Sequence, residues 1–368
     1  MRSIFAVSLA LITGCGDNLS GDPVEPQPEN GDLTSGVEDD GIVPRLVPEV
    51  CASRAWPEVY VEAKDSDLAV VAMTYGAAVL AVPKTGGDLR GFLVDGRGLI
   101  MGDPTGMKII GGKFTGVSAT VADSRLIVGL VDGQNISVNV LRDDLGDYRS
   151  LATVAGSYVG DATVMHARGE RITATGGATG MVLSTFDSAW ASVGSELLAR
   201  SVPTGMTTTA YGNDAMVAWT TATGECHLQR VASNIHSETT FPCANARLAV
   251  DYGSRAGQLV YEDGGDLLLS NILVSSHNEI ANQLMLAPGA KAPRITFDGT
   301  RYWVSYTNIH NDVVVGYLDD KNNLVSTSIE GMKPMNDAYE LAFVNGAVWV
   351  YALDESGFNA SKMCLTRE

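Results

Sequence analysis

Residues Pro293–Met332, PRITFDGTRYWVSYTNIHNDVVVGYLDDKNNLVSTSIEGM, show the pattern of four short strands joined by turns. The predicted strands are Arg294–Phe297, Tyr302–Thr307, Asp312–Leu318 and Leu324–Ile329, with turns at Asp298-Gly299 and Asp319–Asn323. Bulky and β-branched residues favour strands, and Asp, Asn and Gly favour the turns between them. A single antiparallel meander of four strands buries too little apolar surface to be stable alone. The unit therefore requires neighbours of its own kind.

Turn signals recur along the chain at a nearly regular spacing. When the first turn of each unit is aligned, successive turns lie 58, 45, 44, 41, 45 and 47 residues apart. These turns are Asp65-Ser66, Asp123-Ser124, Arg168-Gly169, Gly212-Asn213, Gly253-Ser254, Asp298-Gly299 and Asn345-Gly346. A period of about 40–50 residues with four strands is typical of a β-propeller blade. The sequence predicts an all-β fold, a β-propeller with seven four-stranded blades, and leaves six or eight blades as alternatives.

The last unit contains one strand fewer than the others. Its predicted strands are Tyr339–Val344, Ala347–Ala352 and Phe358–Leu365. Ahead of the first unit, Ile42–Val47 is extended and apolar. In many propellers both termini complete one blade, which removes open sheet edges. We expect the N- and C-terminal strands to close the ring in this way.

The composition favours short strands and excludes two classes of partner. The 368 residues include 40 glycines, and the formal net charge is −18. Abundant Gly suits tight turns between short strands rather than long helices. Nucleic-acid binding needs a clustered basic surface, and so does peripheral docking on anionic lipid. We expect neither interaction, and we expect the folded body to be a monomer.

The first residues have the organisation of a targeting segment. Arg2 provides a short basic region, and Ile4–Ile12 is apolar but too short to span a bilayer permanently. The segment ends in Leu11-Ile12-Thr13-Gly14-Cys15, which resembles the lipobox of bacterial lipoproteins. The resemblance covers this segment alone, and it implies cleavage before Cys15 followed by lipid attachment to its sulfur. An ordinary secretory signal is the alternative, but no A-x-A-like cleavage site follows the apolar region.

The lipobox resemblance also bears on location. Several acyl chains on Cys15 would anchor the protein to a membrane stably. Gly16, and not Asp, follows Cys15, which by resemblance to the enteric sorting pattern implies the outer rather than the inner membrane. Residues 16–41 contain eight acidic residues, no basic residue and three prolines, so we expect a disordered tether. The predicted domains are thus a signal peptide (1–14), a lipidated cysteine with its linker (15–41) and the propeller (42–368).

Four cysteines remain if Cys15 carries lipid. In an exported, oxidising compartment they are expected to form disulfides. Cys226 and Cys243 flank a predicted hairpin, Glu225–Val231 with Glu238–Cys243, whose ends lie at bridging distance. Cys51 and Cys364 would then join the N-terminal closing strand to the last strand. Free buried thiols are the alternative, and the spacing of the cysteines matches no zinc site.

Motifs with defined chemistry are absent from the sequence. It contains no nucleophile elbow, zinc-protease helix, P-loop or dinucleotide-binding loop in the required context, and it implies no cofactor. Residues Asp319–Asn323 are similar to a calcium loop but lack its Gly and bidentate Glu, so a hairpin turn is the better interpretation. The five histidines are scattered, which favours strand faces or loops over catalysis: His166, His227, His236, His277 and His310.

One irregular segment is a candidate binding loop. The first interval between turns is 58 residues, and the surplus falls around Asp95–Gly112. Long loops on a rigid scaffold commonly carry binding functions. The candidate residues in it are Asp95, Arg97, Asp103 and Lys108. A fifth strand or a longer outer hairpin explains the surplus equally well.

Two classes of function remain open. The first is an envelope-anchored binding or scaffold module with a protein or carbohydrate ligand. The second is a propeller hydrolase or lyase with acidic residues in the central funnel, for which the fold alone is no evidence. A convergent cluster of Asp, Glu, His or Arg with displaced pKa values at the channel would favour the enzyme. Because the units share no catalytic motif, the sequence favours binding.

Overall fold

The computed structural model describes eleven ranges of the chain: 45–57, 65–103, 105–122, 124–133, 135–155, 164–167, 170–211, 214–231, 238–251, 256–273 and 279–367. Within them lie 29 strands and one short 3-10 helix. The predicted signal peptide, Cys15 and the linker lie outside the described residues. Among the described residues, no helix has the length and apolar character that crossing a membrane requires.

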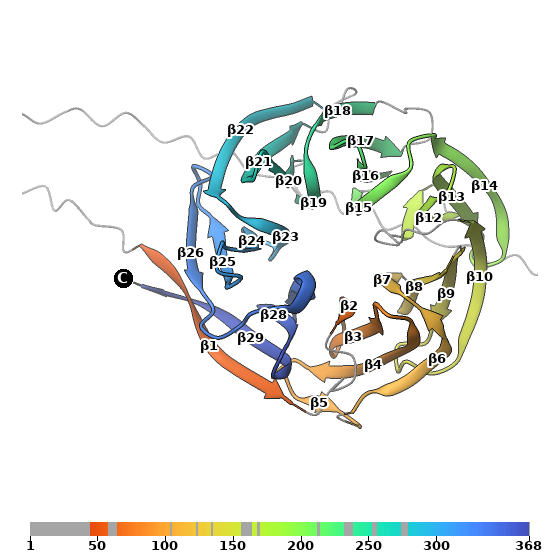
Figure 1. Ribbon diagram of the computed structural model, residues 1–368, viewed down its shortest axis with the longest axis horizontal. Coiled ribbons are helices and arrows are strands. Elements are labelled where there is room, and N and C mark those ends of the chain that lie inside the picture. Colours follow the sequence, from red (N-terminus) through yellow and green to blue (C-terminus); the bar gives the residue numbers. More distant parts are fainter. Residues whose placement is uncertain are drawn as a thin grey trace, which may run out of the picture. The chain divides into compact units, whose positions relative to one another are not determined.

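The strands form seven antiparallel sheets arranged as blades around a central channel, as Figure 1 shows. Blade 1 contains β2 (Ser66–Met73), β3 (Gly76–Pro83), β4 (Gly87–Asp95), β5 (Ile100–Met101) and β6 (Met107–Phe114). Blade 2 contains β7 (Gly116–Ala122), β8 (Arg125–Asp132), β9 (Asn135–Leu141) and β10 (Tyr148–Ala155). Blade 3 contains β11 (Val164–Ala167), β12 (Glu170–Gly177), β13 (Gly180–Phe186) and β14 (Ser192–Ala199).

The remaining blades continue around the same axis. Blade 4 contains β15 (Pro203–Tyr211), β16 (Asp214–Thr221), β17 (Glu225–Val231) and β18 (Glu238–Pro242). Blade 5 contains β19 (Ala244–Asp251), β20 (Ala256–Asp263), β21 (Asp266–Leu273) and β22 (Glu279–Pro288). Blade 6 contains β23 (Lys291–Phe297), β24 (Tyr302–Thr307), β25 (Val313–Leu318) and β26 (Leu324–Ser328). The predicted β-propeller of seven blades is therefore confirmed.

Blade 7 closes the ring with strands from both ends of the folded unit. It contains β27 (Tyr339–Val344), β28 (Ala347–Asp354), β29 (Gly357–Arg367) and β1 (Leu46–Trp56), with helix η1 (Met335–Asp337) just before β27. The N-terminal strand β1 pairs with β29 antiparallel, from Leu46 opposite Arg367 to Trp56 opposite Phe358. The predicted closure is confirmed. The described closing strand begins at Leu46, and residues 42–44 of the expected Ile42–Val47 lie outside the described residues.

The first blade corrects one of the predicted turns. Asp65-Ser66 is not a hairpin turn, because Ser66 begins the innermost strand β2. The matching turn lies at residues 74 and 75, between β2 and β3. Most of the apparent surplus in the first interval therefore comes from a misplaced turn. The rest comes from a divided outer strand, since β5 and β6 both pair with β4.

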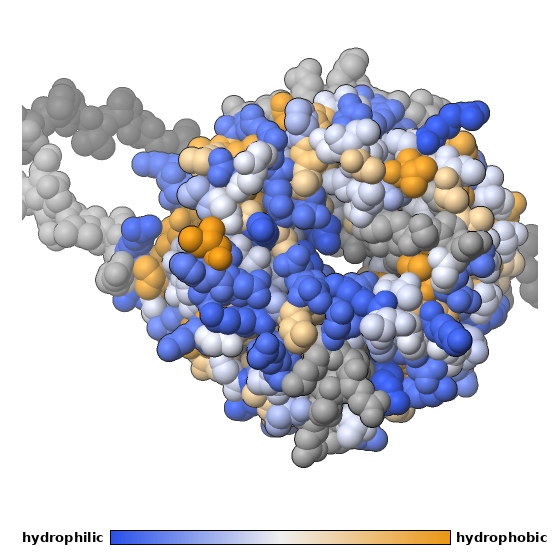
Figure 2. Space-filling model, in the orientation of Figure 1, coloured by the Kyte–Doolittle hydropathy of each residue, from blue (hydrophilic) through white to orange (hydrophobic). Residues whose placement is uncertain are grey.

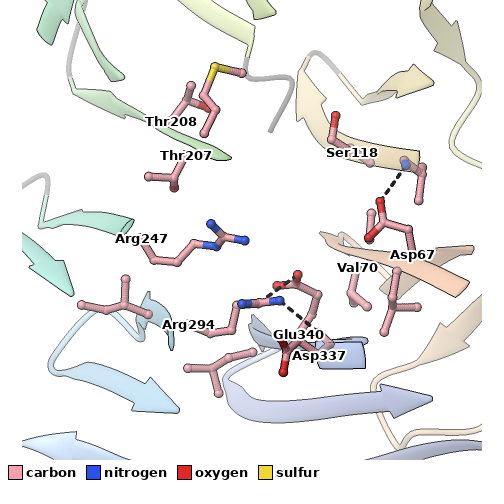
Figure 3. Close-up of a pocket in the computed structure, with 16 residues that line it drawn as sticks. Asp67, Val70, Ser118, Thr207, Thr208, Arg247, Arg294, Asp337 and Glu340 are labelled. Atoms are coloured by element: carbon pink, nitrogen blue, oxygen red, sulfur yellow. Dashed lines mark hydrogen bonds and ion pairs between the residues drawn. The ribbon is translucent and has the colours of Figure 1, made fainter. Parts of the chain in front are cut away.

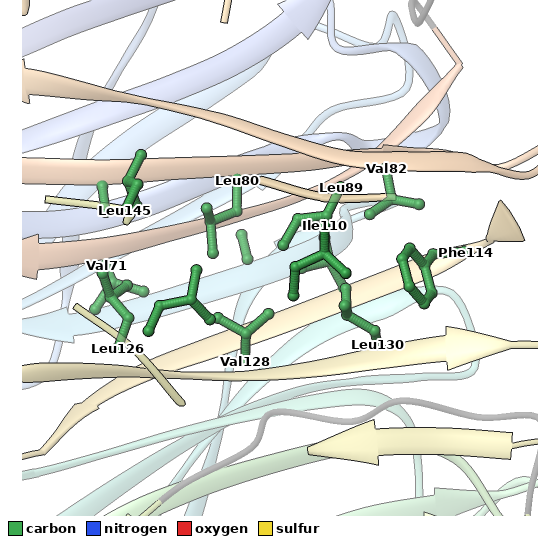
Figure 4. Close-up of a cluster of buried hydrophobic side chains, with 14 of the residues drawn as sticks. Val71, Leu80, Val82, Leu89, Ile110, Phe114, Leu126, Val128, Leu130 and Leu145 are labelled. Carbon is green, nitrogen blue, oxygen red and sulfur yellow. The ribbon is translucent and has the colours of Figure 1, made fainter. Parts of the chain in front are cut away.

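Buried side chains between neighbouring blades form the core. Seven apolar clusters are present among the described residues, and each joins two adjacent blades. In the cluster of Figure 4, Leu80 and Leu89 of blade 1 pack against Leu126 and Leu130 of blade 2. Each blade thus has two buried faces, which explains why its inner strands are apolar nearly throughout.

Strand β24 shows this double burial residue by residue. Trp303, 3 % exposed, packs toward blade 7, whereas Val304 and Tyr306 pack toward blade 5. Alternate side chains of a strand point to opposite faces, so both faces of blade 6 are covered. The indole N–H of Trp303 donates to Asp298 Oδ2 at 2.7 Å, which satisfies the buried polar atom.

Both predicted disulfides are present. Cys51–Cys364 links β1 to β29 across a sequence separation of 313 residues, with the two Cα atoms 5.7 Å apart. Cys226–Cys243 links the start of β17 to the residue after β18, with the Cα atoms 5.3 Å apart. The first disulfide joins the two strands that close the ring, and the second holds an outer hairpin of blade 4.

Candidate functional site

A cavity of about 340 Å³ occupies the central channel. Its lining comes from the innermost strands of six blades, β2, β7, β15, β19, β23 and β27, and from η1. Figure 2 shows the central opening, with hydrophilic side chains gathered along part of its border. Figure 3 shows that Asp67, Arg247, Arg294, Asp337 and Glu340 converge there. No aromatic side chain is among the described residues that line this cavity.

The two arginines follow irregularities in their strands. The pairing of β19 with β20 shifts register between Ala244 and Arg247, and that of β23 with β24 shifts between Lys291 and Arg294. Such bulges bend a strand and redirect the side chains next to them. Each bulge contains a non-glycine residue in the left-handed region, Asn245 at φ 48° and Ala292 at φ 51°. Backbone of this kind persists only where the surrounding structure holds it in place.

Glu262 on β20 holds both bulges. Its Oε1 accepts a hydrogen bond from Asn245 Nδ2 at 2.9 Å and another from the backbone N–H of Ala292 at 2.7 Å. The carbonyl of Ala292 in turn accepts the hydroxyl of Tyr339 at 2.5 Å. One carboxylate of blade 5 therefore positions the segments that present Arg247 and Arg294 to the channel.

Arg294 is bound closely by its neighbours. Its Nε lies 3.1 Å from Glu340 Oε1, and its guanidinium also donates to the backbone carbonyl of Tyr339. The guanidinium carbon lies 4.9 Å from the centre of the Tyr339 ring, which adds a cation–π contact. Arg294 and Glu340 therefore neutralise each other at the junction of blades 6 and 7.

Arg247 has far fewer partners. Within the described part of the chain, its guanidinium donates one hydrogen bond, to the carbonyl of the adjacent Ala246 at 3.1 Å, and pairs with no carboxylate. Figure 3 shows its guanidinium extending toward the middle of the channel. An Arg presents five N–H donors in a planar fork, so most of its donors remain available to a ligand.

Asp67 extends into the channel from blade 1. Its Oδ2 accepts the backbone N–H of Val117 at 2.9 Å, an interaction between blades 1 and 2. Burial raises the pKa of this carboxyl, although the Val117 N–H and the positive charges of Lys84 and Arg294 act in the opposite direction. Among the described residues no cation forms a salt bridge with it. Its charge is therefore only partly compensated within the protein.

Hydroxyl groups line another part of the cavity. Ser118 comes from blade 2, and Thr207 and Thr208 come from blade 4. The Thr208 hydroxyl oxygen is buried and has no hydrogen-bond partner in the described part of the molecule. A buried polar atom without a partner is costly, and at a binding site a ligand can supply the missing bond.

The predicted binding-loop residues lie elsewhere, at the outer edge of blade 1. Asp95 Oδ2 pairs with Arg97 at 3.0 Å, and Lys108 pairs with Asp88 at 2.8 Å. Asp103 accepts hydrogen bonds from the N–H and hydroxyl of Thr105, and these lower its pKa. The side chain of Arg97 is 80 % exposed. The four residues make local turn and strand contacts, and none of them lines the channel cavity.

The histidines and the calcium-like turn have structural surroundings. His227 is buried, stacks on Trp219 with ring centres 4.9 Å apart, and contacts Glu238 at 2.6 Å through Nδ1. His310 lies exposed in the turn after β24, while the other three histidines lie outside the residues whose side chains are described. Asp319 caps its own turn by accepting the N–H groups of Lys321 and Asn323. The described residues contain no group of three or more His, Cys, Asp or Glu arranged to hold a metal.

A repeated sequence signal marks the channel residues. The inner strands contain the segments DLAV from Asp67, RLAV from Arg247, RITF from Arg294 and ELAF from Glu340. Each segment places one charged residue before an apolar run on an innermost strand. The charged residue lies at a variable distance from the first turn of each unit, so the spacing of the turns does not reveal this pattern.

Comparisons with known proteins support the fold alone. No protein-family model matches the chain, and no curated protein matches it. A chain in the crystal structure of BBS1N in complex with ARL6DN aligns with a TM-score of 0.57 and 12% identity, covering 88% of this chain and 98% of that one. A mutant of the Aleuria aurantia lectin AAL in complex with Fucα1-6GlcNAc aligns with a TM-score of 0.50 and 12% identity, covering 74% and 98%.

Proposed function

We propose that this protein is a lipid-anchored binding protein of the bacterial cell envelope, whose propeller takes a ligand into its central channel. The observation that carries the proposal is the convergence of charged side chains from four different blades on one cavity. Burying charges costs free energy unless they are paired, and Arg247 has no carboxylate partner in the described structure. An arginine that faces a cavity without a carboxylate partner is suited to bind a ligand.

The anchor is proposed from the lipobox resemblance at Leu11–Cys15. Two disulfides in the folded unit agree with an exported protein, because disulfides persist in oxidising compartments. Gly16 after the cysteine supports the outer membrane over the inner membrane. The acidic tether would hold a monomeric propeller away from the lipid.

Replacing Cys15 with Ser tests the anchor directly. We expect Cys15→Ser to remove metabolic labelling by a fatty acid and to release the protein from the membrane fraction. Ser at this position leaves no thiol for acylation, while Cys51→Ser serves as a control that leaves the lipobox intact. A Cys15→Ser variant that is still labelled and processed like the wild type contradicts the anchor.

The structural neighbours agree with a binding role. One of them is seen in a complex between two proteins, and the other with a fucose-containing sugar. At 12% identity neither transfers its ligand to this chain. They support the expectation that the partner is a protein or a carbohydrate.

One observation favours the second candidate, a hydrolase or lyase. Asp67 combines a channel position with a raised pKa, which is the property of a general acid or base. Acid–base catalysis on a substrate commonly needs two such groups. Of the other two carboxylates that line the cavity, Glu340 is held by Arg294 and Asp337 is exposed. Binding therefore remains the better supported function.

A ligand screen tests the binding function. The full lipidated protein in detergent is screened by thermal unfolding against glycans and small charged metabolites, in parallel with an Asp67→Asn/Arg247→Gln double variant. We expect at least one compound to raise the unfolding temperature of the wild type and not that of the variant. If every stabilising compound acts equally on both proteins, the channel is not the binding site. Turnover of a bound compound that Asp67→Asn abolishes favours the enzyme.

A further inference from the structure

The charges in the channel follow a definite order around the ring. Arg247 belongs to blade 5, Arg294 to blade 6, Glu340 to blade 7 and Asp67 to blade 1. Two positive side chains on blades 5 and 6 are therefore followed by negative ones on blades 7 and 1, and Asp337 of η1 adds a third carboxylate just before β27. Among the described lining residues, blades 2 and 4 contribute uncharged groups instead, so the described charges lie on blades 5, 6, 7 and 1, which form one arc of the ring.

The middle two charges of this arc bind each other, and the outer two do not. Arg294 and Glu340 form an ion pair at 3.1 Å in which the arginine is 11% exposed and the glutamate 26%. Arg247 retains a single hydrogen bond to the Ala246 carbonyl, and Asp67 retains the Val117 N–H. In Figure 3 these two side chains extend toward the cavity from opposite sides. Among the described residues, Arg247 is thus a positive group of the cavity without an ion-pair partner, while Asp67 and the exposed Asp337 are carboxylates without one.

This arrangement discriminates between ligand classes. A ligand with only a carboxylate would pair with Arg247 but leave Asp67 desolvated beside an added negative charge. A ligand with only an ammonium group has the converse problem, and a neutral sugar compensates neither charge. Desolvated and unpaired charges weaken binding, and complementary charges give specificity. A ligand that carries both charges satisfies the two ends of the arc together.

Building on the proposed function, we propose that the channel binds a small zwitterion, with its carboxylate on Arg247 and its ammonium group on Asp67. The planar guanidinium suits a carboxylate because it forms two parallel hydrogen bonds. Thr207 and Thr208 line the same cavity as the two charges. Glu262 serves as a positioning residue, since it holds the bulges before both channel arginines.

The test measures binding of a series of linear amino acids to the full lipidated wild-type protein by calorimetry. The probes are glycine, β-alanine, 4-aminobutyrate, 5-aminopentanoate and 6-aminohexanoate, whose charges lie progressively farther apart. Each is compared with the carboxylate lacking the amine and with the amine lacking the carboxylate. We expect one probe, or two adjacent ones, to bind roughly 10- to 100-fold more tightly than both singly charged analogues, the range for one charge-assisted hydrogen bond.

Variants locate the binding within the molecule. Arg247→Gln and Asp67→Asn should each weaken binding of the preferred probe by roughly 10-fold or more. The matched changes Arg97→Gln and Asp132→Asn alter exposed outer residues and should leave binding unchanged. Because the analogue comparison uses the wild type alone, it decides the proposal even if a channel variant folds poorly.

Several outcomes overturn the zwitterion. They are failure of every probe to bind, equal binding of the singly charged analogues, and retention of binding in both channel variants. If a neutral glycan binds and Arg247→Gln abolishes that binding, the ligand class is wrong while the proposed binding function stands. If the channel variants alter the binding of no compound in either experiment, the proposed function fails as well.

Discussion

The inner three strands of blade 6 and of blade 1 form the same antiparallel meander, but the sequence signals for this meander differ between the two blades. In blade 6 the first turn is closed by Asp298, whose Oδ1 accepts the N–H groups of Thr300 at 2.7 Å and Arg301 at 2.6 Å. In blade 1 the corresponding turn is formed by Thr74 and Tyr75, and Thr74 is exposed. Asp and Gly mark a turn because of specific local hydrogen bonding and φ preferences, and a turn without them gives no such signal.

The outer strands differ in the same way. Blade 6 ends in the single strand β26, whereas blade 1 divides its outer strand into β5 and β6. Asp and Gly residues in turns therefore reveal the position of a blade only where its turns contain them. Where packing between blades holds the strands, the repeat persists without local signals. The following experiments test how far this difference in local support extends to stability.

The largest effect is expected from removing blade 6. Deletion of Lys291–Met332 should abolish soluble folding, because it exposes the apolar faces of blades 5 and 7 and opens the ring. Shortening residues 97–106 in blade 1 to a tight turn should cost about 2 kcal/mol or less, since β5 contributes only two paired residues. Expression, gel filtration and urea unfolding measure both. A folded monomer without blade 6 argues against a closed ring.

A large effect is also expected from the buried tryptophan of blade 6. Trp303→Ala should lower the free energy of unfolding by about 3–5 kcal/mol, because the indole is 3 % exposed and fills the junction with blade 7. Val79→Ala in blade 1 is the matched change at a fully buried site between blades 1 and 7. Because valine is smaller than tryptophan, we expect a smaller loss of unfolding free energy. Urea unfolding midpoints give both values. A loss for Trp303→Ala near that of a surface residue is inconsistent with double burial.

An intermediate effect is expected at the turns. Asp298→Ala removes the acceptor for two backbone N–H groups and for the Trp303 indole, so it should cost about 1–3 kcal/mol. Thr74 in blade 1 is exposed, and its side chain makes no hydrogen bond within the described part of the chain, so Thr74→Ala should change the free energy of unfolding by no more than about 0.5 kcal/mol. Thermal unfolding of the two variants in the same buffer compares them. Equal losses would show that local turn chemistry does not distinguish the two blades.

The smallest effect is expected from Asp67, the channel residue of blade 1. The corresponding channel residue of blade 6 is Arg294. Burial raises the pKa of Asp67 above that of the unfolded chain, so folding favours the protonated carboxyl. Its contribution to stability is present below the ordinary Asp pKa and is lost as pH rises through the raised value. Asp67→Asn should therefore stabilise the protein near neutral pH and lose this advantage in acid. Urea denaturation of the wild type and of Asp67→Asn between acidic and neutral pH shows whether their difference in stability depends on pH. Asp132→Asn is the control at an exposed carboxyl.

The sequence alone was sufficient for the architecture. The unit at Pro293–Met332 was predicted with strand limits that differ from β23–β26 by three residues at most. Blade number, closure by both ends and the pairing of the four described cysteines followed from repeat spacing and topology. The strands and turns are encoded locally, because alternating apolar residues and turn residues act over a few positions of the chain, and the closure then follows from the number of strands at the two ends. The lipobox at Cys15 is equally local and stays a prediction.

The candidate site was decided only by the tertiary structure. Asp67, Arg247, Arg294 and Glu340 are far apart in the sequence, and the ring brings them to one cavity because each lies on an innermost strand. The two bulges that turn the arginines inward depend on Glu262, which belongs to another strand. The outer loop of blade 1 is irregular in sequence, yet its charged side chains form ion pairs or hydrogen bonds with near neighbours. These side chains are Asp95, Arg97, Asp103 and Lys108. Whether a charge has a partner is set by contacts across blades, and a linear pattern does not contain them.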